Sequence, residues 1–461
     1  MISIFRRSAN RSPYHRGLRQ TAAAGTAVLT AGLLLFSSGT ASASPKLTSQ
    51  VVHVAAASSS CGSLTVMTDA TRLPAVQDYE KAHPCVKVTT TIFGYSGSTL
   101  QTKIGLFNRE GSGWPELMWD PGTPDAGWLD SPTYHYAAVL NHGLVPQSEI
   151  SQWAFNSLDV CSANGNVYCL RNDIAANVLW YNAPLMKKFG YTIPTTWQQY
   201  AQIGQEVAKQ HPGYVIGTIG DSYDDAIYFW GTGCPTNDLV GTMKLEVNMS
   251  AAPCKEIASL LDPLIKDGTV STLSVTSPAY IKKYGLTDKT LMMVGATWYG
   301  QYVMEANFNP AKGTWGAALP LSLGSFHDTG DIGGGIWEVS SHSSSATQKL
   351  AAQAAYWLTT APAYQKTAPT YPANTIAAKL WLTTLNSSGI FANSNIGTVF
   401  ETASNEIWPG YSFPLFNPEP IWASTVVPAL VGGKSMSAEL SAWQTALSNQ
   451  AKTFGYQVVN S

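Results

Sequence analysis

Strand-like and helical stretches alternate along residues 61–120. The segments LTVMT and VKVTTTIF are rich in β-branched residues and indicate strands, and AVQDYEKAH between them has a helical pattern. A helix over residues 98–108 and a strand in GWPELMWD continue the alternation. Alternation of this kind predicts an α/β fold, with a mostly parallel sheet covered by helices on both faces.

The stretch LWYNAPLMKKFGYTIPTTWQQY, residues 179–200, contains three local signals in sequence. Its first residues are apolar and aromatic and favour a strand. Asn182 is typical of a helix N-cap and Gly190 of a helix end, which predicts a short helix between them. Thr196 followed by Gln199 has the pattern of a capping box and predicts a second helix. The predicted order is strand, helix, helix.

Both kinds of pattern return in the second half of the chain. Helical stretches occupy residues 255–266, 345–360 and 436–454, and strand signals recur in LMMVGA and GIWEVSS. About 400 residues beyond the leader exceed one ordinary hydrophobic core. The sequence therefore predicts two α/β lobes, with the chain crossing between them more than once.

The first 43 residues have the parts of a secretory signal peptide. Arginines form a basic start, Ala22–Phe36 is apolar, and Ala41-Ser42-Ala43 fits a cleavage site. The apolar run is shorter than the roughly 20 residues of a membrane span, so an uncleaved anchor is the less favoured alternative. We expect a signal peptide over residues 1–43, a flexible spacer over 44–60 and an exported chain, extracellular or associated with the bacterial cell surface.

Charge and composition narrow the class of partner. The leader holds five of the 27 basic residues and no acid, which leaves 22 basic against 29 acidic residues and a net charge of −7. Charged residues make up only 12% of the chain and form no basic stripe, which argues against a nucleic-acid partner. The 15 Trp and 21 Tyr supply flat rings that fill cores and also serve as platforms for ligands.

Six cysteines in an exported chain predict disulfides. Two of them flank the hairpin turn signal NGN, which makes a bridge across a hairpin feasible. Two others each precede a strand-like run, and they lie at one sheet end if those strands are parallel neighbours. The last two remain as a loop-closing pair. The expected pairs are Cys61–Cys85, Cys161–Cys169 and Cys234–Cys254. A metal site is the alternative, but no C-x-x-C occurs and the eight His are scattered, so we expect no metal.

Several short motifs come close to catalytic or phosphate-binding signatures. PALVGGKS has Pro428 where a phosphate-binding loop requires its first Gly, and we interpret it as a turn between helices. GYSGS ends in Ser98 where a hydrolase nucleophile elbow has Gly, and a polar rim is the simpler interpretation. Glu110 and Glu116 could serve a glycosidase, but sequence spacing alone is no signature of one.

The segment GDIGGGIWEV, residues 330–339, has too many glycines for the middle of a strand and lacks the spacing of a dinucleotide fingerprint. Three consecutive glycines before a strand suit a backbone that bends or approaches a ligand closely. A hinge between lobes and an ordinary loop both fit this pattern.

Taken in order, these segments resemble the extracellular solute-binding proteins of ABC importers, in the sugar-binding family 1 that includes maltose-binding proteins. The resemblance runs from about residue 61 to the C-terminus. It is carried by QDYEKAHPCVKVTT, WPELMWD, NGNVYCL, LWYNAPLMKKFGYTIPTTW, MMVGATWYGQYV, GGGIWEVSSHS and YPANTIAA. Two features depart from the family: Arg171 stands where relatives commonly have Pro, and no lipobox is visible at Cys61.

The resemblance implies a two-lobed fold of the periplasmic-binding-protein type II, with a ligand cleft between lobes joined by a hinge. It implies that lobe I comprises residues 61–173 plus 331–375 and lobe II residues 174–330 plus 376–461. The ligand lies between the lobes, which close about the hinge. Ligand-binding positions carried over from the family fall on Asp69, Tyr95, Ser96, Trp119, Asp120, Asp173, Trp230, Trp298, Tyr299 and Trp422.

The function implied by the resemblance is that of a receptor without catalytic activity, a monomer that needs no cofactor. It would bind a sugar, in particular an oligosaccharide, and deliver it to the permease subunits of an ABC importer. The carboxylates would accept hydrogen bonds from sugar hydroxyls and the rings would stack on the sugar. A secreted carbohydrate-active hydrolase is the alternative from another class, and a receptor for a different small solute such as a polyol is a third.

Overall fold

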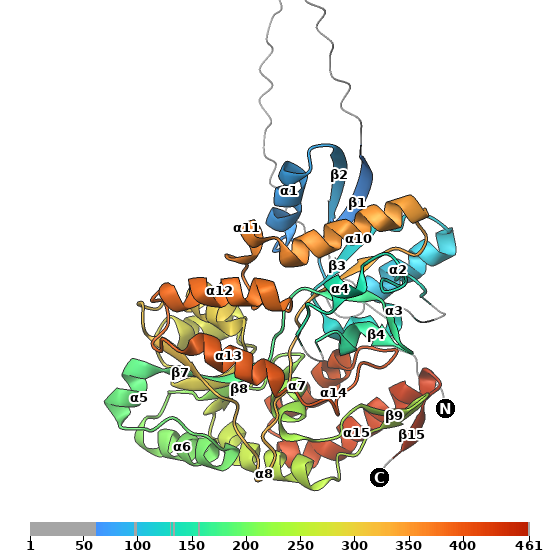
Figure 1. Cartoon of the computed structure of the whole chain (residues 1–461). Coiled ribbons are helices and arrows are strands. Elements are labelled where there is room, and N and C mark those ends of the chain that lie inside the picture. The colour runs from blue at the N-terminus through green and yellow to red at the C-terminus, as the bar shows by residue number, and fades with distance from the viewer. Residues whose placement is uncertain (1–60, 96–98, 130, 132–133, 155–156, 460–461) are drawn as a thin grey trace, which may run out of the picture. The chain divides into compact units, whose positions relative to one another are not determined.

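The first sheet of the computed structural model contains the predicted β-α-β unit (Figure 1). Helix α1 (Leu73–Ala82) joins two parallel strands that start together, with Gly62 opposite Val86. The third strand is parallel to the first, and the last two strands are antiparallel to their neighbours. The order across the sheet is β2 (Val86–Ile92), β1 (Gly62–Thr68), β3 (Leu117–Asp120), β14 (Ile336–Val339) and β6 (Cys169–Arg171).

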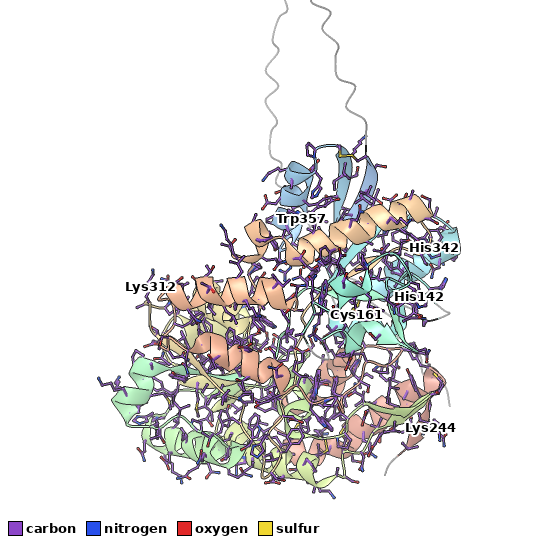
Figure 2. The ribbon with its side chains drawn as sticks, viewed as in Figure 1. His142, Cys161, Lys244, Lys312, His342 and Trp357 are labelled. Atoms are coloured by element: carbon purple, nitrogen blue, oxygen red, sulfur yellow. A yellow bond between two sulfur atoms is a disulfide. The ribbon has the colours of Figure 1, made fainter. Side chains whose placement is uncertain are left out.

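Helices cover both faces of this sheet. On one face Leu64, Val66 and Leu117 belong to the core that also contains residues of α1 and of α10 (Ser345–Thr360). Trp357 on α10 meets Tyr79 of α1 edge to face, with ring centroids 5.5 Å apart (Figure 2). On the other face a smaller apolar cluster joins β1 and β3 to α2 (Thr99–Glu110). The two-sided burial explains why these strands are apolar on both sides.

The second sheet has three strands and is antiparallel throughout. β7 (Asn177–Asn182) lies in the middle, between β12 (Met292–Ala296) and β13 (Trp315–Ala318), and runs antiparallel to both. The mostly parallel sheet is predicted from the alternation over residues 61–120, and this second sheet does not share that arrangement. Every residue of β12 is buried. A strand that is buried on both faces has the same continuous apolar sequence whether its neighbours are parallel or antiparallel, so the sequence does not indicate the direction.

The stretch over residues 179–200 has the predicted order of strand, helix, helix. After β7, the Asn182 side chain accepts a hydrogen bond from the Leu185 N–H and caps α5 (Ala183–Phe189). Gly190 ends this helix with φ 77°. The second helix, α6 (Trp197–Gln210), starts at Thr196, whose hydroxyl accepts from the Gln199 N–H.

The later helices also occur where the pattern predicts them. PALVGGKS spans the end of α14 and the turn before α15, as predicted. Remaining elements include α7 (Asp224–Tyr228), α8 (Ala252–Lys266), α12 (Thr375–Ser387), α13 (Ile396–Asn405), α14 (Glu419–Val431), α15 (Met436–Thr453), and a small sheet of β9 (Asp238–Gly241), β10 (Lys244–Glu246) and β15 (Gln457–Val459).

The three predicted disulfides are present, as Cys61–Cys85, Cys161–Cys169 and Cys234–Cys254. The first ties together the starts of β1 and β2. The second closes the hairpin of β4 (Ser162–Ala163) and β5 (Asn166–Val167), whose turn residues Asn164 and Gly165 both have positive φ. Each bridge restricts the unfolded chain and stabilises the fold by about 2–4 kcal/mol.

The structure describes residues 61–459 except 96–98, 130, 132–133 and 155–156. The predicted signal peptide, the spacer over 44–60 and Ser96 lie outside the described residues. Among the described residues, no helix is both long and apolar enough to cross a membrane. The predicted lobe boundaries at residues 173, 330 and 375 stay a prediction.

Candidate functional site

Three segments run side by side between the two sheets. Residues 172–176 connect β6 of the first sheet to β7 of the second, and residues 331–335 lead into β14. The Ile332 N–H of the second segment donates to the Ala175 carbonyl of the first. The third segment contains Tyr371, whose carbonyl accepts a hydrogen bond from the Ile174 N–H of the first segment. The isolated bridges Ala176–Asp331 and Asp173–Pro372 between these segments are antiparallel, and short adjacent connections of this kind have the geometry of a hinge.

Glycines in the second crossing segment meet a steric requirement. Gly333 and Gly334 have φ 81° and 79°, a region that side chains with a Cβ rarely adopt. A Cβ on Gly334 would also approach the Asp173 carbonyl oxygen to 2.5 Å. The GGG run is therefore explained by backbone conformation and by close packing of two crossing segments.

Two buried ion pairs hold the crossing segments. Arg171 pairs with Asp331, and both side chains are almost fully buried. Arg171 also donates to the Asp173 carbonyl over 3.0 Å. Arg72, at the start of α1, pairs with the Asp173 carboxylate over 3.3 Å. Arg171 thus places a buried charge pair at the crossing segments.

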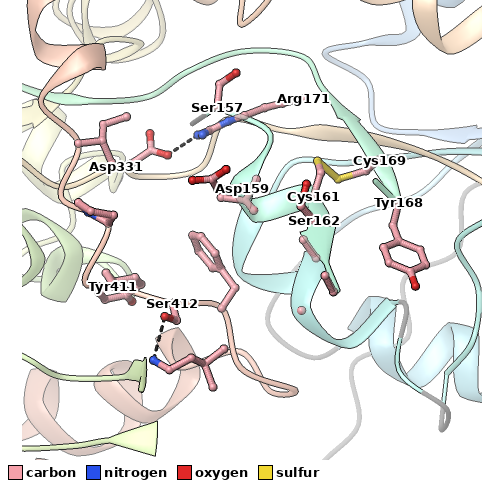
Figure 3. A pocket seen from close by; sticks show the side chains of 18 of the residues that line it. Ser157, Asp159, Cys161, Ser162, Tyr168, Cys169, Arg171, Asp331, Tyr411 and Ser412 are labelled. Atoms are coloured by element: carbon pink, nitrogen blue, oxygen red, sulfur yellow. Dashed lines mark hydrogen bonds and ion pairs between the residues drawn. A yellow bond between two sulfur atoms is a disulfide. The ribbon is translucent and has the colours of Figure 1, made fainter. Parts of the chain in front are cut away.

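A cavity of about 670 Å³ opens beside these segments. Figure 3 shows Arg171 and Asp331 pointing toward each other at its edge, with the Cys161–Cys169 disulfide on one side and Tyr411 and Ser412 on another. Its volume lies in the range of small-molecule sites. Its wall combines residues of the first sheet and its loops with residues from the region of the second sheet, among them Ala126, Glu338, Ile174, Trp230, Trp408, Tyr411, Phe413 and Tyr456.

Aromatic rings form much of that wall. Trp230 stacks on Tyr411 with ring centroids 4.1 Å apart and an angle of 6° between the planes. The Trp230 indole N–H donates to the Trp408 carbonyl over 2.8 Å, which fixes the pair. Flat rings held this rigidly can stack on the C–H faces of a sugar.

A second aromatic group gathers around Arg72. Its guanidinium lies 4.5 Å from the centroid of the Trp119 ring and donates to the Tyr302 hydroxyl. The Trp119 indole N–H donates to Asp69 over 3.1 Å. Trp298 is half-buried, and its indole N–H donates to the Ile332 carbonyl in the second crossing segment over 2.9 Å. This group therefore links strand ends of the first sheet to the crossing segments.

Several buried carboxyl groups lie close enough to feel one another's charge. Burial, together with the charge of Asp125, raises the pKa of Asp120 well above its usual range, and burial and the charge of Asp120 do the same for the pKa of Glu338. Burial raises the pKa of Asp225 to about 7. Burial and the charges of Asp225 and Asp125 raise the pKa of Glu419 to about 8. Such strong shifts are typical of functional sites.

These raised pKa values predict that the free energy of unfolding rises as the pH falls. The pKa of a carboxyl group in the unfolded chain is near 4. The folded chain therefore binds protons more tightly at Asp225 and Glu419, and the stability lost to their burial is recovered as the pH drops below about 8. Thermal melts without ligand are expected to give a higher Tm at pH 6 than at pH 9. The Glu419→Gln variant should have a smaller difference; equal differences in the two proteins would contradict this assignment.

The structure places the predicted site residues in three settings. Asp69, Tyr95, Trp119 and Asp120 lie together at the carboxyl ends of β1, β2 and β3, and the Tyr95 hydroxyl donates to the Trp119 carbonyl. Asp173, Trp298 and Tyr299 lie at the crossing segments or directly beyond β12, and Trp230 lines the cavity.

Among the predicted rings, Trp119 and Tyr299 are as deeply buried as Trp422. Trp422 lies within a group of core rings. It is fully buried, and its ring centroid lies 4.9 Å from that of Trp443. Phe229 packs against it from another side, and the indole N–H donates to the Asp221 carbonyl over 3.0 Å. These surroundings favour a packing role.

Other polar and aromatic residues of the region were not predicted: Arg72, Asp125, Asp225, Tyr223, Trp408, Tyr411 and Glu419. Glu419 lies three residues before Trp422, about one turn earlier on α14. The structure shows that Glu419 is the residue near the carboxylates of Asp125 and Asp225, which the sequence alone does not indicate. The run Tyr223-Asp224-Asp225 is a local signal that could have indicated the acidic wall.

Among the comparisons with known proteins, only the comparison with solved structures finds matches, and those matches agree with the fold described above. No protein-family model and no curated relative matches the chain. Among solved structures, the galacto-N-biose/lacto-N-biose I-binding protein of an ABC transporter from Bifidobacterium longum, in complex with lacto-N-biose, has a TM-score of 0.71 at 20% identity, covering 86% of this chain and 98% of that one.

Two further solved structures agree with this match. An ABC-transporter-associated binding protein from B. animalis subsp. lactis, in complex with β-1,6-galactobiose, has a TM-score of 0.65 at 18% identity over 86% of this chain and 99% of its own. The GacH receptor of Streptomyces glaucescens, solved unliganded and in complex with acarbose, has a TM-score of 0.63 at 18% identity over 86% and 99%. The chain therefore has the predicted two-lobed fold of these binding proteins.

Proposed function

We propose that this chain is an exported, monomeric receptor that binds an oligosaccharide between its lobes and delivers it to the permease subunits of an ABC importer. It performs no chemical step on the sugar. The observation that carries the proposal is the cavity of about 670 Å³ beside the crossing segments, walled by stacked rings and carboxylates. Saccharides need this combination, because rings match their C–H faces and carboxylates accept from their hydroxyls.

The similar structures support the same class of ligand. Those named above hold lacto-N-biose, a galactobiose or acarbose, each a saccharide or a close analogue. All three are binding proteins or receptors, which favours a receptor over a secreted hydrolase. A polyol receptor is less favoured, because the cavity is larger than one linear polyol requires.

The proposed binding residues keep the predicted set and extend it. The residues that we propose stack on the sugar are Trp119, Trp230, Trp298, Tyr95 and Tyr299. Those that we propose form hydrogen bonds with its hydroxyls are Asp69, Ser96, Asp120 and Asp173. Trp422 remains in the predicted set as the member whose packing disfavours ligand contact. We add Trp408 and Tyr411, which line the cavity, and behind them Asp225, which accepts from the Tyr411 hydroxyl, and Glu419, which lies near Asp225.

A saccharide panel tests the proposal. Purified protein is titrated with di- to tetrasaccharides while intrinsic fluorescence is followed, and each mixture is analysed for hydrolysis products. Saturable binding without turnover is the expected result. Turnover would favour the hydrolase, and the absence of binding across the panel would contradict the receptor. Solution scattering with the best ligand is expected to give a smaller radius of gyration, as hinge closure requires.

Replacing Trp298 with Ala is expected to weaken binding of the best saccharide by about 1–3 kcal/mol, the scale of removing an aromatic ring from an interface. Trp298 is half-buried and held against the second crossing segment by its indole N–H. The matched control is Trp357→Ala on α10, a half-buried Trp that packs on α1. The control should melt lower and bind unchanged. Equal losses of affinity in both variants would contradict a role for Trp298 in holding the ligand.

A further inference from the structure

Charged side chains occupy only one part of the cavity wall. Among the described residues that line the cavity, the charged ones are Asp159, Arg171, Asp331 and Glu338, and they come from the first sheet, its loops and the crossing segments. A second part of the lining comes from the β9–β10 hairpin, the segment over residues 412–415 and Tyr456, and none of its residues is charged. We call this second part the hairpin wall. Figure 3 shows its Ser412 well apart from the Arg171–Asp331 pair.

The hairpin wall exposes large apolar side chains. Leu239 on β9 and Met243 in the turn both line the cavity, and their exposed fractions are 39% and 38%. Met243 has φ 54°, a left-handed conformation for which hairpin turns prefer Gly, Asn or Asp. The chain therefore has an apolar side chain at a turn position where a small polar residue would be less strained. Apolar surface that stays exposed beside a cavity is typical of a surface that binds apolar groups.

Hydroxyl groups of the hairpin wall already have partners. The Ser412 hydroxyl accepts from the Leu239 N–H over 2.9 Å and donates to the Asp238 carboxylate over 3.4 Å. The Tyr456 hydroxyl accepts from the Leu415 N–H over 3.0 Å. A sugar hydroxyl placed against this wall would give up hydrogen bonds with water and find few to replace them. An apolar group would give up none and would remove apolar surface from water.

We infer that the saccharide bound by this receptor carries an apolar group at one end, as an aryl or alkyl glycoside does, and that this group lies against Leu239 and Met243. The inference rests on the proposed saccharide-receptor function. The sugar units lie toward the charged residues and the stacked rings of Trp230 and Tyr411, where hydroxyls find acceptors and C–H faces find flat surfaces. The apolar group extends past these rings to the hairpin wall.

A lip that closes over any ligand is the competing role for the β9–β10 hairpin. In that role the hairpin covers whatever sugar is bound, so a change to Leu239 or Met243 weakens the binding of a free saccharide and of its apolar glycoside by the same factor. If the hairpin instead contacts an apolar group, only the glycoside loses affinity. The ratio of the two affinities therefore separates the two roles.

The experiment compares matched ligands that differ only in the group at the reducing end. For each of several disaccharides, calorimetry measures the free sugar, its phenyl glycoside and its glyceryl glycoside, which carries a polar group in place of the ring. The phenyl glycoside is expected to bind about tenfold or more tightly than the other two, the factor that burial of one aromatic ring supplies. Its binding should also have the more negative heat-capacity change, which marks the burial of apolar surface.

Two variants, Leu239→Thr and Met243→Asn, remove the apolar surface and keep the hairpin. Thr favours strands and Asn tolerates the left-handed conformation, so both variants should fold, and Met243→Asn should melt no lower than the parent. Each is expected to lose most of the preference for the phenyl glycoside. The matched control is Val240→Thr, because Val240 is the next residue on β9, is 48% exposed and is not among the described lining residues. The control should keep the preference.

The outcomes separate this inference from the proposed function. Equal affinities for the phenyl glycoside and the free sugar overturn the inference and leave the receptor intact. A preference that survives both hairpin variants, or that is lost in the Val240→Thr control, does the same. Losses by one common factor for glycoside and free sugar assign the hairpin the role of a lip and also overturn the inference. Absence of binding by every sugar and glycoside overturns both statements.

Discussion

Replacing Arg171 with Met is expected to lower the free energy of unfolding by about 3–5 kcal/mol, the cost of leaving one charge of a buried pair without its partner. Side-chain exposure is 2% for Arg171 and 1% for Asp331. Asp331 would keep only the hydrogen bond from the Ala175 N–H, 2.9 Å away. The Arg171 side chain also donates to the carbonyls of Asp173 and Gly333, so both crossing segments lose a shared donor. Chemical denaturation at pH 7 measures the effect.

A double-mutant cycle separates the pair from its surroundings. Arg171→Met with Asp331→Asn removes both charges and keeps an acceptor for the Ala175 N–H, so it should cost less than the sum of the single variants. The control is Lys81→Met, which breaks an exposed pair with Asp78 and should cost less than about 1 kcal/mol. Additive single-variant losses would contradict direct coupling of Arg171 to Asp331.

Much of the fold could be predicted from local signals. The caps at Asn182 and Thr196 and the turn signal at Asn164-Gly165 act within a few residues, so they determine structure without reference to distant parts. The disulfide pairs followed from two such local features and from elimination. The direction of β12 and β13 relative to β7 could not be predicted, because it depends on how distant segments pack together. A run of apolar residues has the same pattern in a parallel and in an antiparallel strand.

The candidate site could be predicted only in part, for the same reason. Asp69, Tyr95 and Asp120 follow strands whose carboxyl ends meet at one sheet edge, so their proximity is a consequence of the local pattern. Asp225 and Glu419 lie far apart in the chain, and their approach depends on how α7 and α14 pack. Arg72 precedes its helix without any motif, and its role depends on Asp173 and Trp119, which only tertiary structure brings near.

The crossing segments and the proposed site share charged groups. Asp173 belongs to a crossing segment and holds Arg72, which lies against Trp119 beside the proposed ligand. Trp298 contacts the second crossing segment through Ile332. A ligand that contacted Trp119 and Trp298, as we propose, would therefore also act on the crossing segments, which is how binding would favour one closed arrangement.

Replacing Trp422 with Ala is expected to lower the free energy of unfolding by about 3–5 kcal/mol, the range for a buried aromatic ring removed from a core. The ring lies between Phe229 and Trp443, and its removal leaves a cavity and an Asp221 carbonyl without its donor. Saccharide affinity, measured well below the melting temperature, should stay close to that of the parent, whereas Trp298→Ala loses affinity. If Trp422→Ala does not fold, Trp422→Phe keeps a ring in the core and serves for the affinity measurement. A Trp422 variant that melts like the parent but binds saccharide weakly would place this ring in the ligand site, as the family resemblance implies, and would show that the packing around it opens when the ligand enters.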